Sequence, residues 1–340
     1  FKVLLQRWAS DGPVRLTSKP DPDHANRVRF DLRFQDGPHW ELREQVHLAA
    51  HQTYPVFYAT RVDASGTAPV AVYLDGWEYH GADQDQVDKD AMKRASLREA
   101  GIGVWTLTWP DVKAALTAAS QESTVSPVTP LSNAVRHAAT QGAKKANGED
   151  HPAFEALKQG AFEQLMTFLR HPDPQAWRSL ATTTALAPAN SGVKVDVADR
   201  LAAVEQVAAG EDVVISEAPT DIAAVTWLSQ NDLRCVSVLQ KGDAIPSAVV
   251  SLDTHEDPDK SRWADWIHLG NLLQYLGETA VVITTRTYVS GVPGPLPAEP
   301  AGEASSVEVE SLLEDVFDQA TLPLARAAIA AGFIELAVGY

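Results

Sequence analysis

The chain has 340 residues, of which 45% are hydrophobic, and this is enough to bury two cores of ordinary domain size. Its formal net charge of −17 argues against broad affinity for nucleic acids, because such binding depends on neutralising phosphates. The charge is uneven, since residues 1–116 carry a net charge of −2 and the remainder −15, so any phosphate contact is expected in the first part.

The first part of the chain has the pattern of a sheet followed by a helix and a further strand. Residues 9–26 are rich in Pro, Asp and Ser and are predicted to be a loop. Period-two alternation or apolar runs predict strands at 27–34, 40–48, 54–62, 70–75 and 101–109, and apolar residues at helical spacing predict a helix at 83–100. We therefore expect several antiparallel strands, a helix and one more strand.

The most informative stretch is the apolar run at 70–74, which leads directly into Asp75 and Gly76. This pattern predicts a buried strand that holds a carboxylate at its end, followed by a turn that carries His80. The next helix brings basic side chains beside this turn. These are Lys89, Lys93, Arg94 and Arg98, which we assign as candidate phosphate contacts, although a solvated helix face has the same pattern.

This arrangement resembles the very short patch repair endonuclease family and its relatives in the PD-(D/E)xK nuclease superfamily. The resemblance covers roughly residues 27–116 and rests on the strand ending in Asp75-Gly76, on His80, and on a helix carrying Asp90, Arg94 and Leu97 before a Gly and a second apolar strand. It implies a restriction-endonuclease-like mixed sheet, an α/β fold.

The resemblance also implies a site and an activity. An earlier Asp on the preceding strand, matched here by Asp63, would share a Mg²⁺ or Mn²⁺ ion with Asp75, and His80 would transfer protons. The expected reaction is metal-dependent hydrolysis of DNA. The same unit resembles the C-terminal portion of large bacterial DEAD/DEAH-box helicases of the phage-defence type, so the expected partners are the rest of such a polypeptide or defence-complex subunits.

The sequence departs from the superfamily pattern in two ways that support an alternative function. No Lys stands near Trp77, where the superfamily places one, and the family's Glu on a first helix has no candidate, because Glu41 lies in a strand-like run. The alternative is a catalytically inactive nuclease-fold module that binds nucleic acid or acts as a scaffold for a helicase complex. A separate class, an interaction domain only, would account best for the acidic second part.

The rest of the chain is predicted to be a linker at 117–150, with a short helix at 132–141, and a second α/β domain at 151–340. Helices are expected at 154–169, 221–230, 262–276 and 307–331, and strands at 212–216, 234–239, 248–252, 279–285 and 333–338. A rival metal site of the Toprim type would use Glu217 and the acidic stretch 253–257. A single cysteine, Cys235, and no apolar run of roughly 18 residues favour a cytoplasmic protein without membrane contacts.

Overall fold

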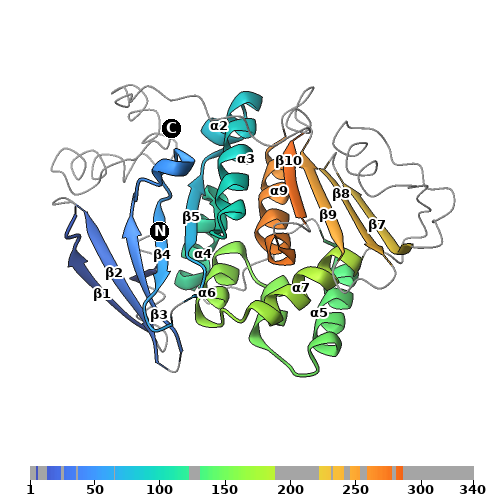
Figure 1. Cartoon of the computed structure of the whole chain (residues 1–340), viewed down its shortest axis with the longest axis horizontal. Helices are drawn as coiled ribbons and strands as arrows, with labels where there is room; N and C mark the ends of the chain where they lie inside the picture. Colours follow the sequence, from blue (N-terminus) through green and yellow to red (C-terminus); the bar gives the residue numbers. More distant parts are fainter. Residues whose placement is uncertain are drawn as a thin grey trace.

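The computed structural model describes residues 5–6, 14–23, 27–35, 37–64, 66–121, 131–187, 222–230, 233–240, 246–252, 259–277 and 281–285. These residues form a six-stranded sheet, a four-stranded sheet and the helices that lie between and below them (Figure 1). The fold is α/β, as the sequence predicts. Among the helices of these residues, none combines the length and the apolar character that a membrane span requires.

The larger sheet has its strands in sequence order. They are β1 (Val14–Pro20), β2 (Val28–Phe34), β3 (His39–Glu44), β4 (Phe57–Arg61), β5 (Val70–Asp75) and β6 (Gly103–Thr108). Neighbours pair antiparallel from β1 to β5, whereas β5 and β6 pair parallel and are joined through helices. The sheet is therefore mixed, and β5 and β6 end at the same edge.

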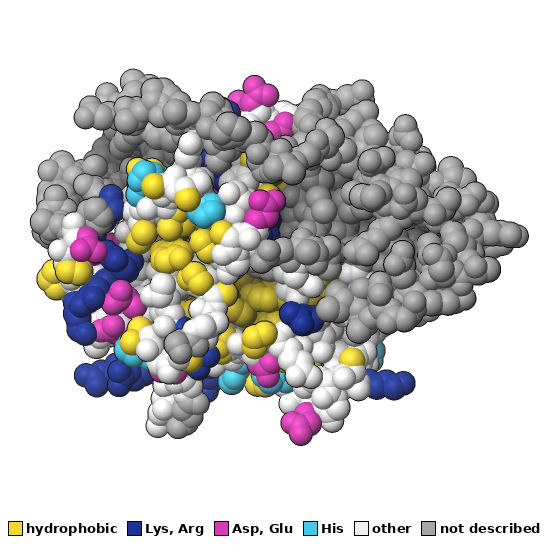
Figure 2. Space-filling model, in the orientation of Figure 1, with side chains coloured by type: hydrophobic (Ala, Val, Ile, Leu, Met, Phe, Trp, Pro, Cys, Tyr) yellow, Lys and Arg dark blue, Asp and Glu magenta, His cyan; other side chains and the backbone are white. Residues whose placement is uncertain are grey.

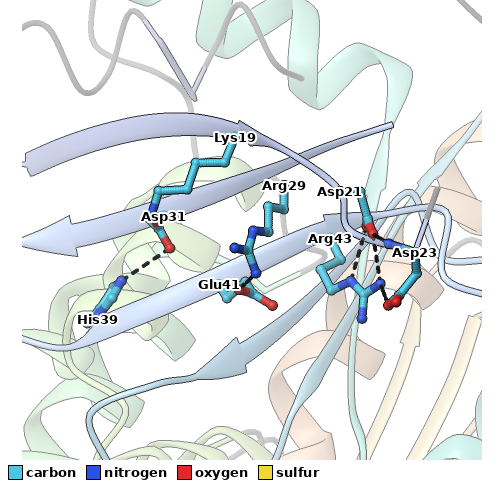
Figure 3. A network of polar contacts seen from close by, with 8 residues as sticks. All are labelled: Lys19, Asp21, Asp23, Arg29, Asp31, His39, Glu41 and Arg43. Atoms are coloured by element: carbon cyan, nitrogen blue, oxygen red, sulfur yellow. Dashed lines mark hydrogen bonds and ion pairs between the residues drawn. The ribbon is translucent and has the colours of Figure 1, made fainter. Parts of the chain in front are cut away.

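The two faces of β2 and β3 follow the alternation of their residues. Phe30, Leu32, Trp40 and Leu42 are buried on one face, where the indole N–H of Trp40 donates to the carbonyl of Leu169 at 2.7 Å. The opposite face is charged, and basic and acidic side chains lie interspersed over β1–β3 (Figures 2 and 3). Its ion pairs are Lys19–Asp31, His39–Asp31, Arg29–Glu41, Arg43–Asp21 and Arg43–Asp23.

The helices that follow β5 and β6 cover the sheet. They are α2 (Trp77–His80), α3 (Gln84–Glu99), α4 (Trp109–Gln121), α5 (Asn133–Asn147), α6 (Ala161–Arg170), α7 (Pro174–Leu186) and α9 (Lys260–Leu273), with the short 3-10 helices η2 (Pro152–Lys158) and η4 (Gln274–Leu276). Another 3-10 helix, η1 (Ala49–His51), lies between β3 and β4. The second sheet has the order β10 (Val281–Thr285), β9 (Ser247–Leu252), β8 (Leu233–Gln240) and β7 (Ile222–Gln230).

Helices α3 and α9 lie between the two sheets (Figure 1): α3 contacts β6 and β10, and α9 contacts β6, β8 and β9. Helix α9 also covers the outer edge of β6 with two amide side chains. Asn271 accepts from the N–H of Thr106 at 2.9 Å and donates to its carbonyl at 2.7 Å, and Gln274 makes the same pair of bonds with Val104 at 2.8 and 2.7 Å. These side chains take the place of a neighbouring strand.

The sequence predicts two domains joined by a linker, but the described residues of both predicted domains pack together. One hydrophobic core contains side chains from both predicted domains, including Trp105 of β6, Trp177 of α7 and Trp263 of α9. Within the predicted linker, residues 133–147 form α5, which packs against α7. The short helix expected at 132–141 is thus longer, and it packs through a buried face of small residues, Ala139, Thr140 and Ala143.

Other elements differ from their predictions in type. Residues 14–20, predicted as loop, form the edge strand β1, and residues 222–230, predicted as helix, form β7. Each segment forms a strand because it pairs with a neighbouring strand: β1 pairs with β2, and β7 pairs with β8. The predicted elements at 212–216, 307–331 and 333–338 lie outside the described residues, as do Glu217 and the stretch 253–257 of the rival site.

Candidate functional site

The site begins at the carboxyl end of β5. Residues Val70, Ala71 and Val72 are buried, and Asp75 pairs in register with Thr108 at the last position of the parallel pair β5 and β6. Ligands of open α/β sheets bind beyond the carboxyl ends of parallel strands. Only 2% of Asp75 is exposed, so its carboxylate needs partners within the protein.

The partners of Asp75 come from α2 and α3. The N-terminus of α3 is capped by Asp83, whose side chain accepts from the N–H of Asp85 at 2.9 Å. Asp90 and Arg94, four residues apart, then lie on one face of α3, and both are buried. His80 is the last residue of α2. Gly76, in an extended conformation, is the N-cap residue of this helix and connects it to β5.

These side chains form a compact charged cluster, which we call the Asp75 cluster: Asp75, His80, Asp90 and Arg94. Arg94 forms an ion pair with Asp75. His80 Nδ1 lies 2.8 Å from Asp90 Oδ2, and the other oxygen of Asp90 accepts from the Gln86 amide at 3.1 Å. One ligand atom each from Asp75, His80 and Asp90 lie within 4.8 Å of one another, so these three residues could hold a metal ion.

The electrostatics of the cluster favour charged forms despite burial. Burial by itself lowers the pKa of His80, but the negative charges of Asp75 and Asp90 outweigh it, and the net pKa is raised. Burial by itself raises the pKa of Asp90, yet the hydrogen bond from His80 and the charge of Arg94 lower it overall. The hydrogen bond between His80 and Asp90 thus favours the protonated form of His80 and the ionised form of Asp90.

Tyr73 completes the surroundings of the cluster. The guanidinium of Arg94 lies 5.5 Å from the centre of the Tyr73 ring, a cation–π geometry, and the Tyr73 hydroxyl is 3.0 Å from that of Thr53. Burial raises the pKa of this phenol. Tyr73 is therefore neutral and acts as a wall that orients Arg94.

Asp63 does not join the cluster. Strands β4 and β5 are neighbours, as predicted, but they run antiparallel with Ala59 opposite Val70. Asp63 follows the end of β4, so it lies beside the beginning of β5, roughly 30 Å from Asp75 at about 3.3 Å per residue. There it pairs with Arg61 at 3.0 Å and accepts from the N–H of His39 at 3.1 Å. The prediction that Asp63 and Asp75 share an ion is wrong.

The predicted phosphate contacts on α3 also differ from expectation. Only Lys89 is exposed; Lys93 and Arg94 are buried, and Arg98 is half-buried. These four residues therefore do not form one basic face toward solvent. The prediction assumed that this side of α3 faces solvent, whereas α3 packs against both β6 and β10, which the sequence did not indicate.

Asp90 is the site residue to which sequence reasoning assigned no role. Its signal was present, because it stands four residues before Arg94 on the same helix and its position belongs to the pattern that resembles the nuclease family. Comparisons of the chain with protein-family models, with curated proteins and with solved structures found no match.

Proposed function

We propose that the chain is a divalent-metal-dependent phosphodiesterase of the nuclease type, with the ion held by Asp75, His80 and Asp90. The observation that carries this proposal is the convergence of three ligand atoms within 4.8 Å at the carboxyl end of β5. DNA as the substrate, and attachment to a larger helicase, rest on the sequence resemblance alone.

The donor set fits such an ion. Asp75 and Asp90 supply carboxylate oxygens and His80 an imidazole nitrogen, a combination that suits Mn²⁺ better than Mg²⁺, which prefers oxygen ligands. Outer contacts orient two ligands, since Gln86 holds Asp90 and Arg94 holds Asp75. When bound, the ion would act as a Lewis acid on the scissile phosphate and neutralise the charge that develops there. Arg94 would hold the Asp75 carboxylate in place through their ion pair.

A second function is favoured by one specific contact. The ion pair with Arg94 already compensates the charge of Asp75, and His80 compensates that of Asp90 when the imidazole is protonated. A cluster that is neutral without a metal ion would stabilise the turn between β5 and α3 and need have no catalytic role. The corresponding function is a non-catalytic nuclease-fold module.

Metal binding separates the two functions. We would measure Mn²⁺ affinity by calorimetry and cleavage of labelled DNA for the parent protein and for Asp90→Asn, which preserves side-chain shape. The phosphodiesterase proposal expects Asp90→Asn to weaken Mn²⁺ binding by more than about a hundredfold, the usual upper effect of losing a contact outside the ligand shell. Cleavage should fall by roughly a thousandfold or more.

The chain supplies a matched control for this experiment. Asp63→Asn removes a carboxylate that sequence analysis also assigned to the metal but that lies at the opposite end of the sheet, so it should leave Mn²⁺ affinity unchanged. A parent protein that binds no Mn²⁺ and cleaves no DNA, or equal affinity in the parent and in Asp90→Asn, would reject the phosphodiesterase and leave the non-catalytic module.

A further inference from the structure

A small cavity lies between α3, β6 and α9, beside the Asp75 cluster. Its volume is about 10 Å³, close to the least space that holds one water molecule. Arg94 and Arg98 line it from α3, Thr106 from β6 and Asn271 from α9, and Trp266 and Ile267 close its apolar side. The cavity is therefore small, partly apolar and bounded by two arginines.

The polar side chains of this cavity offer hydrogen-bond donors. Asn271 is already bonded to β6, because its oxygen accepts from the N–H of Thr106 and its nitrogen donates to the carbonyl of Thr106. Within the described ranges, the Thr106 hydroxyl and the Arg98 guanidinium have no hydrogen-bond partner, and the Nε of Arg98 is buried. A guanidinium has five N–H donors and no acceptor.

The charges of the lining residues are also unbalanced. Arg94 is matched by Asp75, which lies outside the cavity, but no carboxylate among the residues of the described structure pairs with Arg98. Burial, and then the charge of Arg94, lower the pKa of Arg98 to about 9. Because an arginine keeps its proton in proteins, this shift expresses a cation that lacks a counter-charge.

The end of α3 does not supply that counter-charge. A helix C-terminus attracts cations through its unpaired carbonyls. Here the amides of Ala100, Gly101 and Ile102 already donate to the last carbonyls of α3, with Gly101 at a φ of 73° that favours glycine. An anion beside Arg98 would supply the counter-charge that these carbonyls do not.

We propose that this cavity binds a small inorganic anion of the size of chloride, held by Arg98 and Arg94 and by the hydroxyl of Thr106. The small volume and the apolar wall of Trp266 and Ile267 favour a monatomic ion over phosphate, whose four oxygens would need more donors and more space. The bound anion would join α3 to β6 and α9. This inference does not require a bound metal ion, because neither His80 nor Asp90 lines the cavity, but the two sites share Arg94, which pairs with Asp75.

The test compares chloride with gluconate, which is too large for the cavity, at constant ionic strength. Because an anion that binds only the folded protein stabilises it by mass action, replacing gluconate with chloride should raise the Tm of the parent protein by about 2–4 °C. Arg98→Met should abolish this increase. Arg178→Met, which removes an exposed arginine of α7, should show the same increase as the parent.

Two further measurements keep the test decisive if Arg98→Met fails to fold. Thr106→Val keeps both arginines and should reduce the chloride-dependent increase in Tm, and crystals grown in bromide should show an anomalous peak in the cavity. A parent Tm that does not respond to chloride, an equal increase in Thr106→Val, or no bromide peak would overturn the proposal. Stabilisation by phosphate but not by chloride would overturn it as well, in favour of a larger oxyanion.

Discussion

Removal of the amide side chain of Asn271 is the change whose effect on stability follows most directly from the structure. Asn271 of α9 and Thr106 of β6 are both buried, with 2% of each residue exposed. Asn271→Leu keeps the side-chain volume but leaves the N–H and the carbonyl of Thr106 without partners. Each unsatisfied buried group costs about 1–3 kcal/mol, so we expect the free energy of unfolding to fall by about 2–6 kcal/mol.

This loss is large beside the 5–15 kcal/mol that typically stabilises a folded domain. Gln274→Leu removes the same two bonds from Val104, but Gln274 is half-buried, so water can replace part of them and the loss should be about 1–2 kcal/mol. Urea unfolding followed by tryptophan fluorescence measures the free energy of unfolding of both variants. The control is Gln175→Leu, which changes an exposed amide of α7. A loss below about 1 kcal/mol for Asn271→Leu would refute the role assigned to these amides.

Three more predictions concern single side chains. Burial raises the pKa of Asp265 to about 6, so ionisation of this carboxyl lowers the free energy of unfolding as the pH rises through that value. Asp265→Asn should therefore stabilise the protein at neutral pH by about 1 kcal/mol, a figure discounted for the partial exposure of the side chain. Below about pH 4 the substitution should have little effect, and urea unfolding at several pH values measures both results. Gly81→Ala would place a Cβ 2.3 Å from a ring carbon of Trp77 and should cost about 1–3 kcal/mol, measured as a lower Tm. Trp40→Phe leaves the Leu169 carbonyl without its donor and should cost a similar amount, whereas no loss in urea unfolding would show that water replaces the indole.

Much of the first sheet could be predicted because its signals are local. Strands β2 to β5 alternate or end where the sequence changes from apolar to polar, and α3 lies within one residue of its predicted bounds. The failures are elements whose form depends on partners. Residues 14–20 contain few apolar side chains and become β1 only by pairing with β2, and the apolar stretch 222–230 is compatible with a helix until β8 pairs with it.

The site was predictable in part for the same reason. Asp75 and His80 belong to one strand and the turn after it, so sequence distance is a good guide to spatial distance. Asp63 belongs to the preceding strand, and its placement required the direction of pairing. In an antiparallel pair the end of one strand lies beside the beginning of the next. Asp63 and Asp75, each at the end of its own strand, therefore lie at opposite ends of the pair β4 and β5.

The dependence of the six-stranded sheet on the rest of the chain follows from its outer strand, β6. Strand β6 is the last strand of that sheet, and its outer N–H and carbonyl groups are satisfied by Asn271 and Gln274, some 165 residues later. Its buried Trp105 packs edge-to-face on Trp177 of α7, with ring centres 6.1 Å apart. Without the later residues, an unpaired edge and a large indole would face water, the combination that promotes edge-to-edge aggregation. The Asp75 cluster therefore depends on a fold that both parts of the chain build together, because the helix that carries Asp90 and Arg94 lies between their two sheets.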